Sequence, residues 1–330
     1  MDYRSNVTYI TFGGHVEVHK YGYLYFVIMF TVFILVISSN VTIVGIIMIH
    51  KNLHEPMYIF IAALLINSIL FSTVIYPKLL IDFLSEKQII SYPASCLFQW
   101  FLYYWLAVSD FFLLSVMAYD RYVSICNPLQ YPTIMQEKKV NIFLISAWIL
   151  PACQTSGAML LSAKKEICTF HLKGILCNST VQTLHCVRST ILNIYGLFLL
   201  VTFLFLPVLF ILFTYSRILV VSYRCRGVRG RAAQTCLPHL LVLINFSCLT
   251  TYDILLPRME LDSPKIVRLI MTLQVLIYHP LFNPIIYGLK MRRIYDHLKK
   301  LFCRMHKVGG SSPGCPMFHV EVSLSKTPNP

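Results

Sequence analysis

The chain has 330 residues, of which 57% are hydrophobic and only 13% charged, and its mean hydropathy is +0.66. These values lie outside the usual range of water-soluble globular domains and favour a membrane protein. The net charge of +14 would suggest nucleic-acid binding in a soluble protein, but basic segments of a membrane protein face anionic lipid, so we expect no nucleic-acid partner.

Several stretches of the chain are long and apolar enough to cross a lipid bilayer, which needs roughly 20 residues per helix. They cover residues 23–49, 57–82, 97–122, 140–161, 191–220, 236–257 and 266–289. Residues 1–22 are polar and mixed and match no cleavable leader, so we expect the first span to direct insertion. The sequence therefore predicts an all-α membrane protein, a seven-transmembrane helix bundle.

The distribution of basic residues predicts the orientation of this bundle. Most of the 28 lysine and arginine residues lie on the inner side if the N-terminus is outside, as the positive-inside rule requires. We expect an extracellular segment 1–22, a seven-helix domain 23–289 and a cytoplasmic disordered tail 306–330. N-glycosylation sequons begin at Asn6 and Asn178, both on the expected outer side.

The segment 290–305, which follows the last span, has the pattern of an amphipathic helix. Its apolar residues recur at helical spacing among basic ones, as in a helix that lies in the membrane interface: Ile294, Leu298, Leu301 and Phe302. Cys303, near the end of this expected eighth helix, is a candidate for palmitoylation.

Cysteine residues gather in the expected outer segments, where disulfides persist. Cys96 lies before the third span, and Cys168, Cys177 and Cys186 lie in the long outer connection between the fourth and fifth spans. These cysteines allow three pairings, and their spacing does not choose among them. We expect this connection to be a lid stapled by disulfides rather than a flexible linker.

The third span carries a stripe of residues on one helical face. At about 100° per residue, Tyr103, Asp110, Leu114, Met117 and Arg121 point in nearly the same direction. The outer half of the span offers a mixture of bulky and small side chains for an apolar ligand pocket: Tyr103, Tyr104, Ala107, Val108 and Phe111. The alternative is that these side chains only pack against neighbouring helices.

Two motifs lie at the inner ends of spans. Asp120-Arg121-Tyr122 ends the third span, and an arginine at a membrane boundary is costly unless it is solvated or paired. Alone, this triplet would indicate a snorkelling arginine. It is accompanied by Asn283-Pro284-Ile285-Ile286-Tyr287 in the seventh span, where the proline frees a backbone carbonyl and the asparagine supplies donors.

These motifs resemble those of rhodopsin-like G-protein-coupled receptors, and further runs resemble the odorant receptor family. The runs are LHEPMY at 53–58, MAYDRYVSICNPLQY at 117–131, TYS at 214–216 and TCLPH at 235–239. The runs PHLLVLINFS and YPKLLIDFL are most similar to the fish-type branch of that family. The resemblance extends over all the expected spans.

The resemblance implies a receptor in the plasma membrane of olfactory neuron cilia, with Cys96 paired to Cys177 and Cys168 to Cys186. It implies no enzymatic activity. A small odorant would bind between the third, fifth, sixth and seventh spans, against Tyr103, Tyr104, Ala107, Val108, Phe111, Leu199, Phe203, Thr251 and Leu273. Binding would shift the population toward a state with an open cytoplasmic face.

The resemblance also implies a partner, a heterotrimeric G protein of the stimulatory type that raises cyclic AMP. In the resting state the carboxylate of Asp120 would hold Arg121. Its release would let further residues reorganise around the G protein: Arg121, Tyr122, Tyr215, His239 and Tyr287.

Asp110 is a carboxylate at the expected middle of the membrane, where it should be protonated, paired or bound to a cation. We expect it to form an ionic hub, sensitive to a proton or a sodium ion, with Asn40, Ser68, His279 and Asn283. A purely structural polar network is the alternative. Apart from this possible sodium ion, no metal or cofactor is expected.

The sixth span departs from the usual rhodopsin-like pattern, with Ser247 and Leu249 where a tryptophan and a proline are common. The sequence therefore does not identify the residue that triggers movement of this span. Near its outer end, Asp253 and Arg258 could recognise a polar odorant or face water. A transporter or channel would predict internal repeats or paired broken helices. A membrane enzyme would predict a catalytic or metal-ligand cluster. An amine receptor would place an acid where Tyr103 stands.

Overall fold

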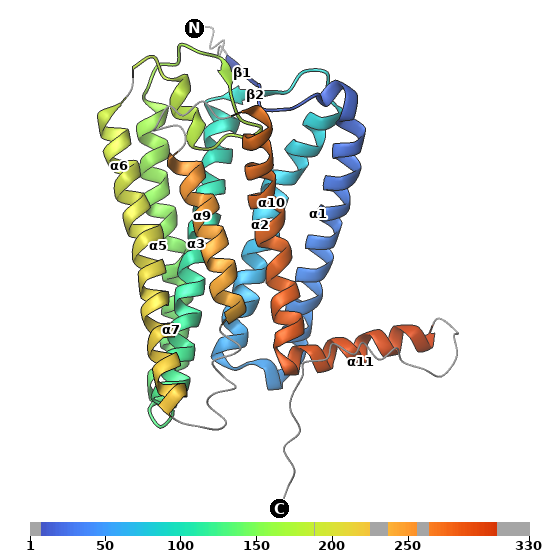
Figure 1. Cartoon of the computed structure of the whole chain (residues 1–330), viewed down its shortest axis with the longest axis vertical. Coiled ribbons are helices and arrows are strands. Elements are labelled where there is room, and N and C mark those ends of the chain that lie inside the picture. Colours follow the sequence, from blue (N-terminus) through green and yellow to red (C-terminus); the bar gives the residue numbers. More distant parts are fainter. Residues whose placement is uncertain (1–7, 188, 225–236, 256–263, 309–330) are drawn as a thin grey trace, which may run out of the picture.

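The computed structural model describes residues 8–187, 189–224, 237–255 and 264–308. Long helices stand side by side along one axis in this part of the chain, and α11 (Arg292–Val308) runs across their end (Figure 1). The long helices are α1 (Val18–Ile49), α2 (Pro56–Leu84), α3 (Ala94–Cys126), α5 (Glu137–Ala163), α6 (Thr190–Leu200) continued by η3 (Val201–Phe205) and α7 (Leu206–Arg224), α9 (Leu237–Leu255) and α10 (Lys265–Lys290).

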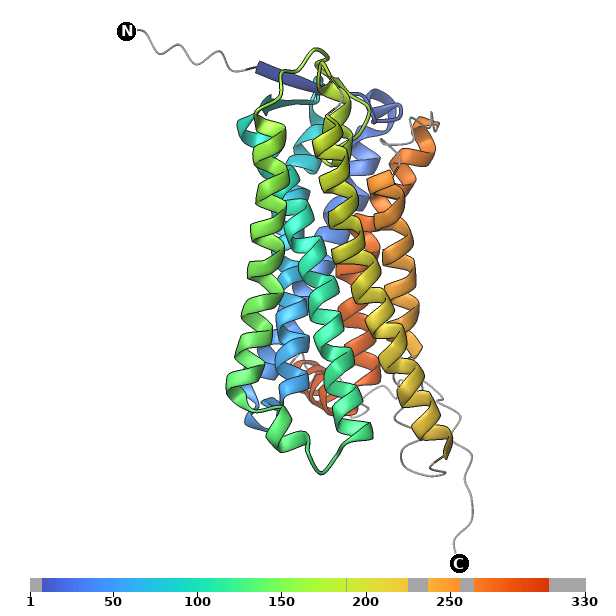
Figure 2. The ribbon, with the colours of Figure 1, turned by 90° about the vertical axis from the view of Figure 1, so that its left-hand side faces the viewer.

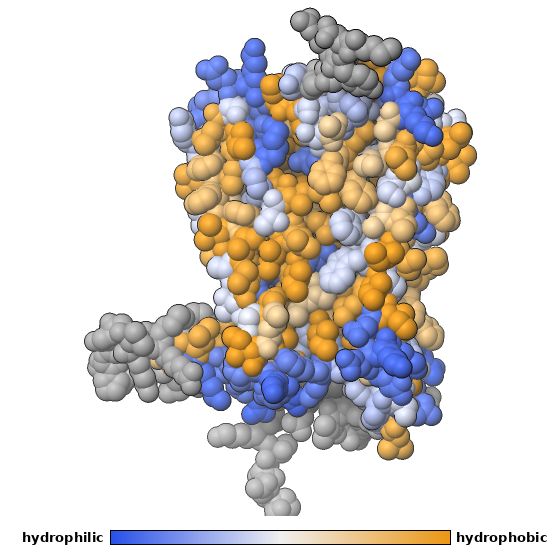
Figure 3. All heavy atoms as spheres, turned by 180° about the vertical axis from the view of Figure 1, so that it is seen from behind, coloured by the Kyte–Doolittle hydropathy of each residue, from blue (hydrophilic) through white to orange (hydrophobic). Residues whose placement is uncertain are grey.

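Six of the described helical segments are long and apolar enough to span a membrane, and the α6–η3–α7 rod is one of them. The seventh, α9, stands beside α7 and α10 (Figure 1). Figure 3 shows the consequence on one face of the molecule, where apolar side chains form a broad belt between two hydrophilic ends. The expected all-α bundle is confirmed.

The core of the bundle follows α2 and α3. In their most apolar stretches 61% and 56% of the residues are buried, against 28% in α1 and 22% in α5. The largest fully buried side chains include Tyr76, Tyr287, Phe60 and Phe111. Because α1 and α5 turn most of their apolar residues outward, these helices face the lipid, whereas α2 and α3 position the inner side chains.

Helix α1 begins five residues before the expected span because it packs closely on the end of α2. Gly22 is buried there, and a Cβ atom at this position would lie only 2.4 Å from the carbonyl oxygen of Phe83. The polar residues that precede the apolar run are therefore part of a helix that the hydropathy pattern alone does not reveal.

A lid covers one end of the bundle, which we call the disulfide end. Strand β1 (Thr8–Phe12) pairs antiparallel with β2 (Ile89–Tyr92) and parallel with β3 (His171–Leu172). The helical turn η2 (Ser179–Leu184) completes the lid. Both expected disulfides, Cys96–Cys177 and Cys168–Cys186, are present, and the first ties the lid to α3.

The opposite end, which we call the α11 end, carries the short connections η1 (Lys51–Leu53) and α4 (Tyr131–Ile134) as well as α11. The side view shows the β1–β3 lid and the C-terminal half of α7 at opposite ends of the bundle (Figure 2). Helix α11 is held by an ion pair of 2.5 Å between Arg293 and Glu55, and by the rings of His50 and His297, whose centroids are 3.9 Å apart.

Candidate functional site

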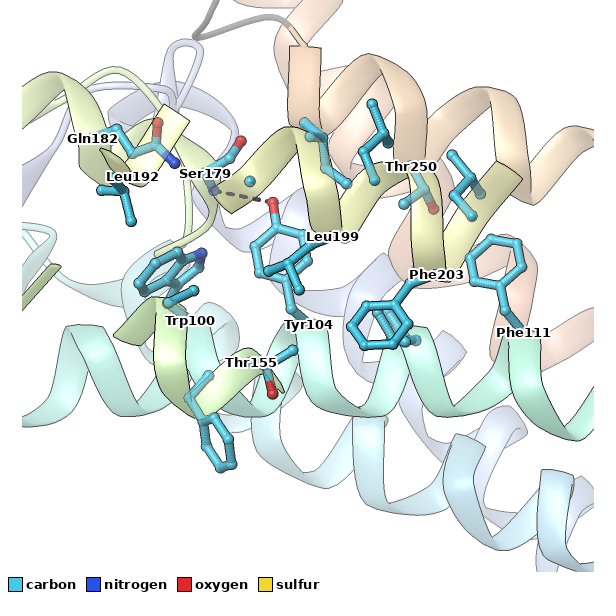
Figure 4. A pocket seen from close by; sticks show the side chains of 18 residues that line it. Trp100, Tyr104, Phe111, Thr155, Ser179, Gln182, Leu192, Leu199, Phe203 and Thr250 are labelled. Atoms are coloured by element: carbon cyan, nitrogen blue, oxygen red, sulfur yellow. Dashed lines mark hydrogen bonds between the residues drawn. The ribbon is translucent and has the colours of Figure 1, made fainter. Parts of the chain in front are cut away.

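A cavity opens near the disulfide end, between α3, α5, the α6–η3 segment, α9 and the lid (Figure 4). The space between its atoms, the open mouth included, is about 750 Å³. Its lining is mainly apolar with a few hydroxyl and amide groups, as is usual in sites for small molecules. We call it the main cavity; it is lined by Trp100, Phe101, Tyr104, Ala107, Val108, Phe111, Thr155, Ala158, Ser179, Gln182, Leu192, Gly196, Leu199, Leu200, Phe203, Leu204, Thr250 and Ile254.

The wall formed by the fifth span owes its shape to the π-helical turn η3. A π turn adds a residue to the helical repeat and so rotates the side chains that follow. Phe203 and Leu204 in this turn are buried and line the main cavity, whereas their neighbour Phe205 is 46% exposed on the outer surface. The ring of Phe203 packs edge-on against Phe112 of α3, with centroids 5.6 Å apart.

The lower end of the main cavity is closed by stacked aromatic rings. Phe111 of α3 stacks on Phe246 of α9, with centroids 4.8 Å apart and planes inclined by 24°. Ser247, which follows, turns its hydroxyl to its own helix and donates a hydrogen bond of 2.6 Å to the carbonyl of Leu243. The aromatic contact between the third and sixth spans therefore comes from Phe246, one position before the serine that the sequence pattern pointed to.

The upper rim of the main cavity is a hydrogen-bond network that joins α3, α9 and the lid. The hydroxyl of Tyr104 donates to the carboxylate of Asp253. It also accepts a bond of 3.0 Å from the backbone N–H of Ser179 (Figure 4). The amide nitrogen of Asn178 donates to the same carboxylate at 2.5 Å, and the hydroxyl of Ser179 donates to the Asp253 carbonyl. We call Tyr104, Asn178, Ser179 and Asp253 the rim network.

Deeper in the bundle, buried amides tie the helices together. Asn40 is fully buried and donates from Nδ2 to the carbonyls of Val36 at 2.7 Å and Pro280 at 3.0 Å, which links α1 to α10. Asn283 donates to the hydroxyl of Ser68 at 3.3 Å, which links α10 to α2. Asp110 is fully buried in α3.

At the α11 end, the buried carboxylate of Asp120 accepts a hydrogen bond of 2.9 Å from the hydroxyl of Tyr131 in α4. Burial, and then the nearby Asp120, raise the pKa of Tyr131, so its phenol stays protonated and donates. The hydroxyl of Tyr287 contacts the sulfur of Met117 at 4.0 Å, one helical turn from Arg121. Tyr131 of α4 and Tyr287 of α10 thus both contact the inner half of α3.

The comparisons with known proteins agree with this architecture. Residues 29–305 match the family described as olfactory receptor. The chain is similar to human Olfactory receptor 11A1, with 30% identity over 303 residues that cover 91% of this chain and 95% of that protein. It is also similar to human Olfactory receptor 2T5, with 34% identity over 289 residues that cover 86% of this chain and 90% of that protein.

The chain belongs to the olfactory receptor family. It is therefore a multi-pass membrane protein and a G-protein-coupled receptor rather than an enzyme. Membership implies odorant ligands and coupling to a G protein, and the main cavity and the inner half of α3 are the parts of this olfactory receptor that suit those roles.

Most of the side chains expected to contact the odorant line the main cavity of the receptor: Tyr104, Ala107, Val108, Phe111, Leu199 and Phe203. Three others do not. Tyr103 points away and packs on Phe71, with ring centroids 5.6 Å apart. Thr250 takes the place expected for Thr251, and Leu273 packs against the helical core instead. One position along a helix turns a side chain by about 100°, which explains the exchange of the threonines.

The expected glycosylation of Asn178 is corrected by the structure. Asn178 is only 5% exposed, and its Nδ2 atom, to which a glycan would be attached, donates to Asp253. Its Oδ1 atom accepts bonds from the backbone and hydroxyl of Thr180, at 3.1 and 2.6 Å. A glycan at this position would break the rim network. The other sequon residue, Asn6, lies outside the described residues.

The expected ion pair between Asp120 and Arg121 is also corrected. Among the salt bridges formed by described residues there is none between these two side chains, and Tyr131 is the hydrogen-bond donor to Asp120. Tyr215 and Tyr287 are buried at this end. The side chains of His239 and His279 lie outside the described part of the structure.

Sequence reasoning missed the polar residue that joins the second, third and fourth spans. Asn67 is fully buried, donates to the carbonyl of Leu106 at 2.8 Å and accepts a bond of 3.0 Å from the indole of Trp148. An asparagine within an apolar span was the available signal, since an amide in a membrane needs partners. The lid residues Ser179 and Gln182 had no such signal, because their position depends on the folding of the lid.

Proposed function

We propose that this olfactory receptor binds a small, mainly apolar odorant in the main cavity and activates a stimulatory G protein at the α11 end. The observation that carries the proposal is the lining of the cavity, in which side chains from α3, α5, α6, η3, α9 and the lid enclose one mostly apolar space. Phe111 and Phe203 supply aromatic surface, and Tyr104 and Thr250 offer hydroxyl groups for orientation.

The signal would pass through the contact between α3 and α9. An odorant against Phe111 changes the free energy of the stack between Phe111 and Phe246, which holds the two helices together beneath the main cavity. A ligand that prefers a displaced α9 shifts the population toward that state by its difference in affinity for the two states. At the α11 end, Arg121, Tyr122, Tyr215, His239 and Tyr287 would then meet the G protein.

We further propose that the disulfide end faces the outside of the cell and the α11 end the cytosol, in olfactory neuron cilia. The disulfides support this orientation because they persist in oxidising compartments. In the same proposal Asn6 carries a glycan and the G protein raises cyclic AMP. The palmitate expected on Cys303 is not part of it, because the sulfur of Cys303 is disulfide-bonded. The runs PHLLVLINFS and YPKLLIDFL support a place in the fish-type branch.

The test is expression of the receptor in cells with a cyclic AMP reporter, against a panel of volatile and water-soluble odorants. For an odorant that activates the receptor, Phe203→Ala should raise the half-maximal concentration at least about tenfold, since removing a buried aromatic side chain costs roughly 3 kcal/mol. The matched control is Phe205→Ala, on the outer side of the same turn, which should leave the response unchanged. Equal responses of the two variants, or an ion current without G protein, would refute the proposal.

A further inference from the structure

A second, smaller cavity lies at the disulfide end, between the lid, α9 and α10. The space between its atoms, open solvent included, is about 380 Å³. Its lining differs from that of the main cavity, because charged and hydroxyl-bearing residues predominate: Tyr252, Asp253, Arg268 and Thr272 line it together with the apolar Met271 and Val275. We call it the outer pocket.

Two opposite charges face this small space. Asp253 comes from α9 and Arg268 from the first turn of α10. The carboxylate of Asp253 accepts hydrogen bonds from Tyr104 and from Asn178, and it carries the negative charge of the pocket. The guanidinium group of Arg268 has five N–H donors in one plane, which suits a carboxylate.

Neutral groups add to the polar character of the outer pocket. The hydroxyl of Tyr252 is buried and, within the part of the chain that the structure describes, has no hydrogen-bond partner. A buried hydroxyl in this state is stabilised by a ligand that accepts a hydrogen bond from it. Met271 and Val275 supply an apolar part of the wall, and Gly174, Asn178 and Thr180 of the lid complete it.

We propose that the outer pocket binds a small zwitterion, an α-amino acid with a short aliphatic side chain. Its carboxylate would bind Arg268 and the hydroxyl of Tyr252, its ammonium group would bind Asp253, and its side chain would contact Met271 and Val275. A zwitterion complements both charged residues of the pocket, whereas a ligand with one charge complements only one of them. This is a ligand class different from the apolar odorant of the main cavity.

The outer pocket is linked to the main cavity by a hydrogen bond to one carboxylate. Asp253 lines the outer pocket and accepts the hydrogen bond of Tyr104, which lines the main cavity. An ammonium group on Asp253 therefore acts on the residue that holds Tyr104 in place. Occupation of either site should change the affinity of the other by the same factor, because such coupling is reciprocal.

Binding of tritiated L-valine to the purified receptor in lipid nanodiscs tests the proposal without any signalling readout. The competitors are unlabelled L-valine, 3-methylbutanoate, which lacks the ammonium group, and isobutylamine, which lacks the carboxylate. We expect L-valine to compete at least about tenfold better than either analogue, the difference that about 1.4 kcal/mol produces. Because binding is measured directly, a receptor that couples to another G protein, or to none, would still give this result.

Variants assign the binding to the outer pocket. Arg268→Gln should weaken L-valine binding at least about tenfold and Tyr252→Phe by about threefold, in line with a charged and a neutral hydrogen bond. Arg293→Gln, at the α11 end, should bind L-valine normally. Each variant is compared at an unchanged thermal midpoint, and Tyr252→Phe decides the matter if Arg268→Gln does not fold.

Three results would overturn the proposal. The first is the absence of saturable L-valine binding below about 1 mM. The second is equal competition by 3-methylbutanoate, which would make the outer pocket a site for simple carboxylates. The third is unchanged binding in both Arg268→Gln and Tyr252→Phe, which would place the amino acid elsewhere.

Discussion

Single hydrogen bonds decide how two of the motif residues act. Asp120 is held by Tyr131, a residue in the same run MAYDRYVSICNPLQY but eleven positions further along the chain. Asn178 is held by Asp253 and Thr180, although its sequon suggested a surface position. In both cases a motif pointed to the residue, but the partner Tyr131 or Asp253 lies in a chain segment whose position depends on folding.

Tyr131→Phe should raise the basal cyclic AMP signal of the receptor. A hydrogen bond to a buried carboxylate contributes roughly 1.5–3 kcal/mol, and its loss favours states in which Asp120 and its neighbours move. The measurement is the reporter signal without odorant, normalised to the amount of receptor at the cell surface. Tyr119→Phe is the control, since Tyr119 contributes ring contacts with Phe143 and Phe210. A basal signal no higher than that of Tyr119→Phe would contradict the role of Tyr131.

At the scale of whole elements, the helices and their order follow from the sequence, but their local geometry does not. The apolar span 191–220 appears as one rod, yet it contains the π turn η3, because π and α turns share the same apolar composition. The sequence predicted that disulfides staple the lid, but it did not predict that β1 and β3 pair within it. Pairing over a long sequence separation depends on register, which the short and mixed segments of the lid do not specify.

The close contact between α1 and α2 predicts the effect of adding one methyl group. Gly22→Ala should lower the thermal stability of the receptor by about 1–3 kcal/mol, because the new Cβ atom would lie 2.4 Å from the carbonyl oxygen of Phe83. Gly45→Ala, in the same helix, is the matched control, since no atom lies within 4 Å of its Cβ position. Thermal unfolding of the two purified variants compares them. A smaller effect at Gly22 than at Gly45 would show that the helices separate at little cost.

The docking of the N-terminal strand predicts a dependence of stability on pH. His15 packs edge-on against Phe12 and Phe83, and both of its ring nitrogens lack a hydrogen-bond partner among the described residues. Burial, and then the charge of Lys78, lower the pKa of His15 from 6.5 to about 4. Between these values the unfolded chain binds a proton at this residue that the folded chain does not. The contribution of His15 to stability is therefore constant above about pH 6.5 and falls as the pH decreases toward 4.

His15→Phe should therefore reduce the loss of thermal stability between pH 7 and pH 5. His19→Phe, at the exposed second residue of α1, is the control for an added aromatic ring. The thermal midpoint of each purified variant is measured at the two pH values. If His15→Phe loses as much stability as the unmodified receptor, groups other than His15 cause the acid sensitivity.

At the scale of the whole molecule, buried polar groups connect the bundle across its width. Asn40, Ser68 and Asn283 join α1, α2 and α10, while Asn67 joins α2 to α3 and α5. The sequence identified the first three and the buried Asp110, because polar residues in apolar spans are conspicuous. Their division into separate pairs could not be predicted, since it depends on the rotation of each helix in the bundle.

Asp110 predicts how the bundle responds to its ionic environment. We propose that this fully buried carboxylate holds a proton or a sodium ion. In the sodium case, replacing choline chloride by sodium chloride should raise the thermal midpoint of the receptor, and Asp110→Asn should remove that difference. Asp296→Asn, exposed on α11, should retain it. A receptor that is insensitive to sodium and signals normally as Asp110→Asn would leave only a structural role for this residue.

The burial of Asn178 has a consequence for the biosynthesis of the receptor. The sequon Asn178-Ser179-Thr180 is intact, so an oligosaccharyltransferase can modify it only while the lid is still open. A chain that acquires a sugar there cannot form the bond from Asn178 to Asp253. Closure of the lid and glycosylation therefore compete for the same nitrogen atom, and a glycan at Asn178 would permanently mark the molecules that folded too slowly.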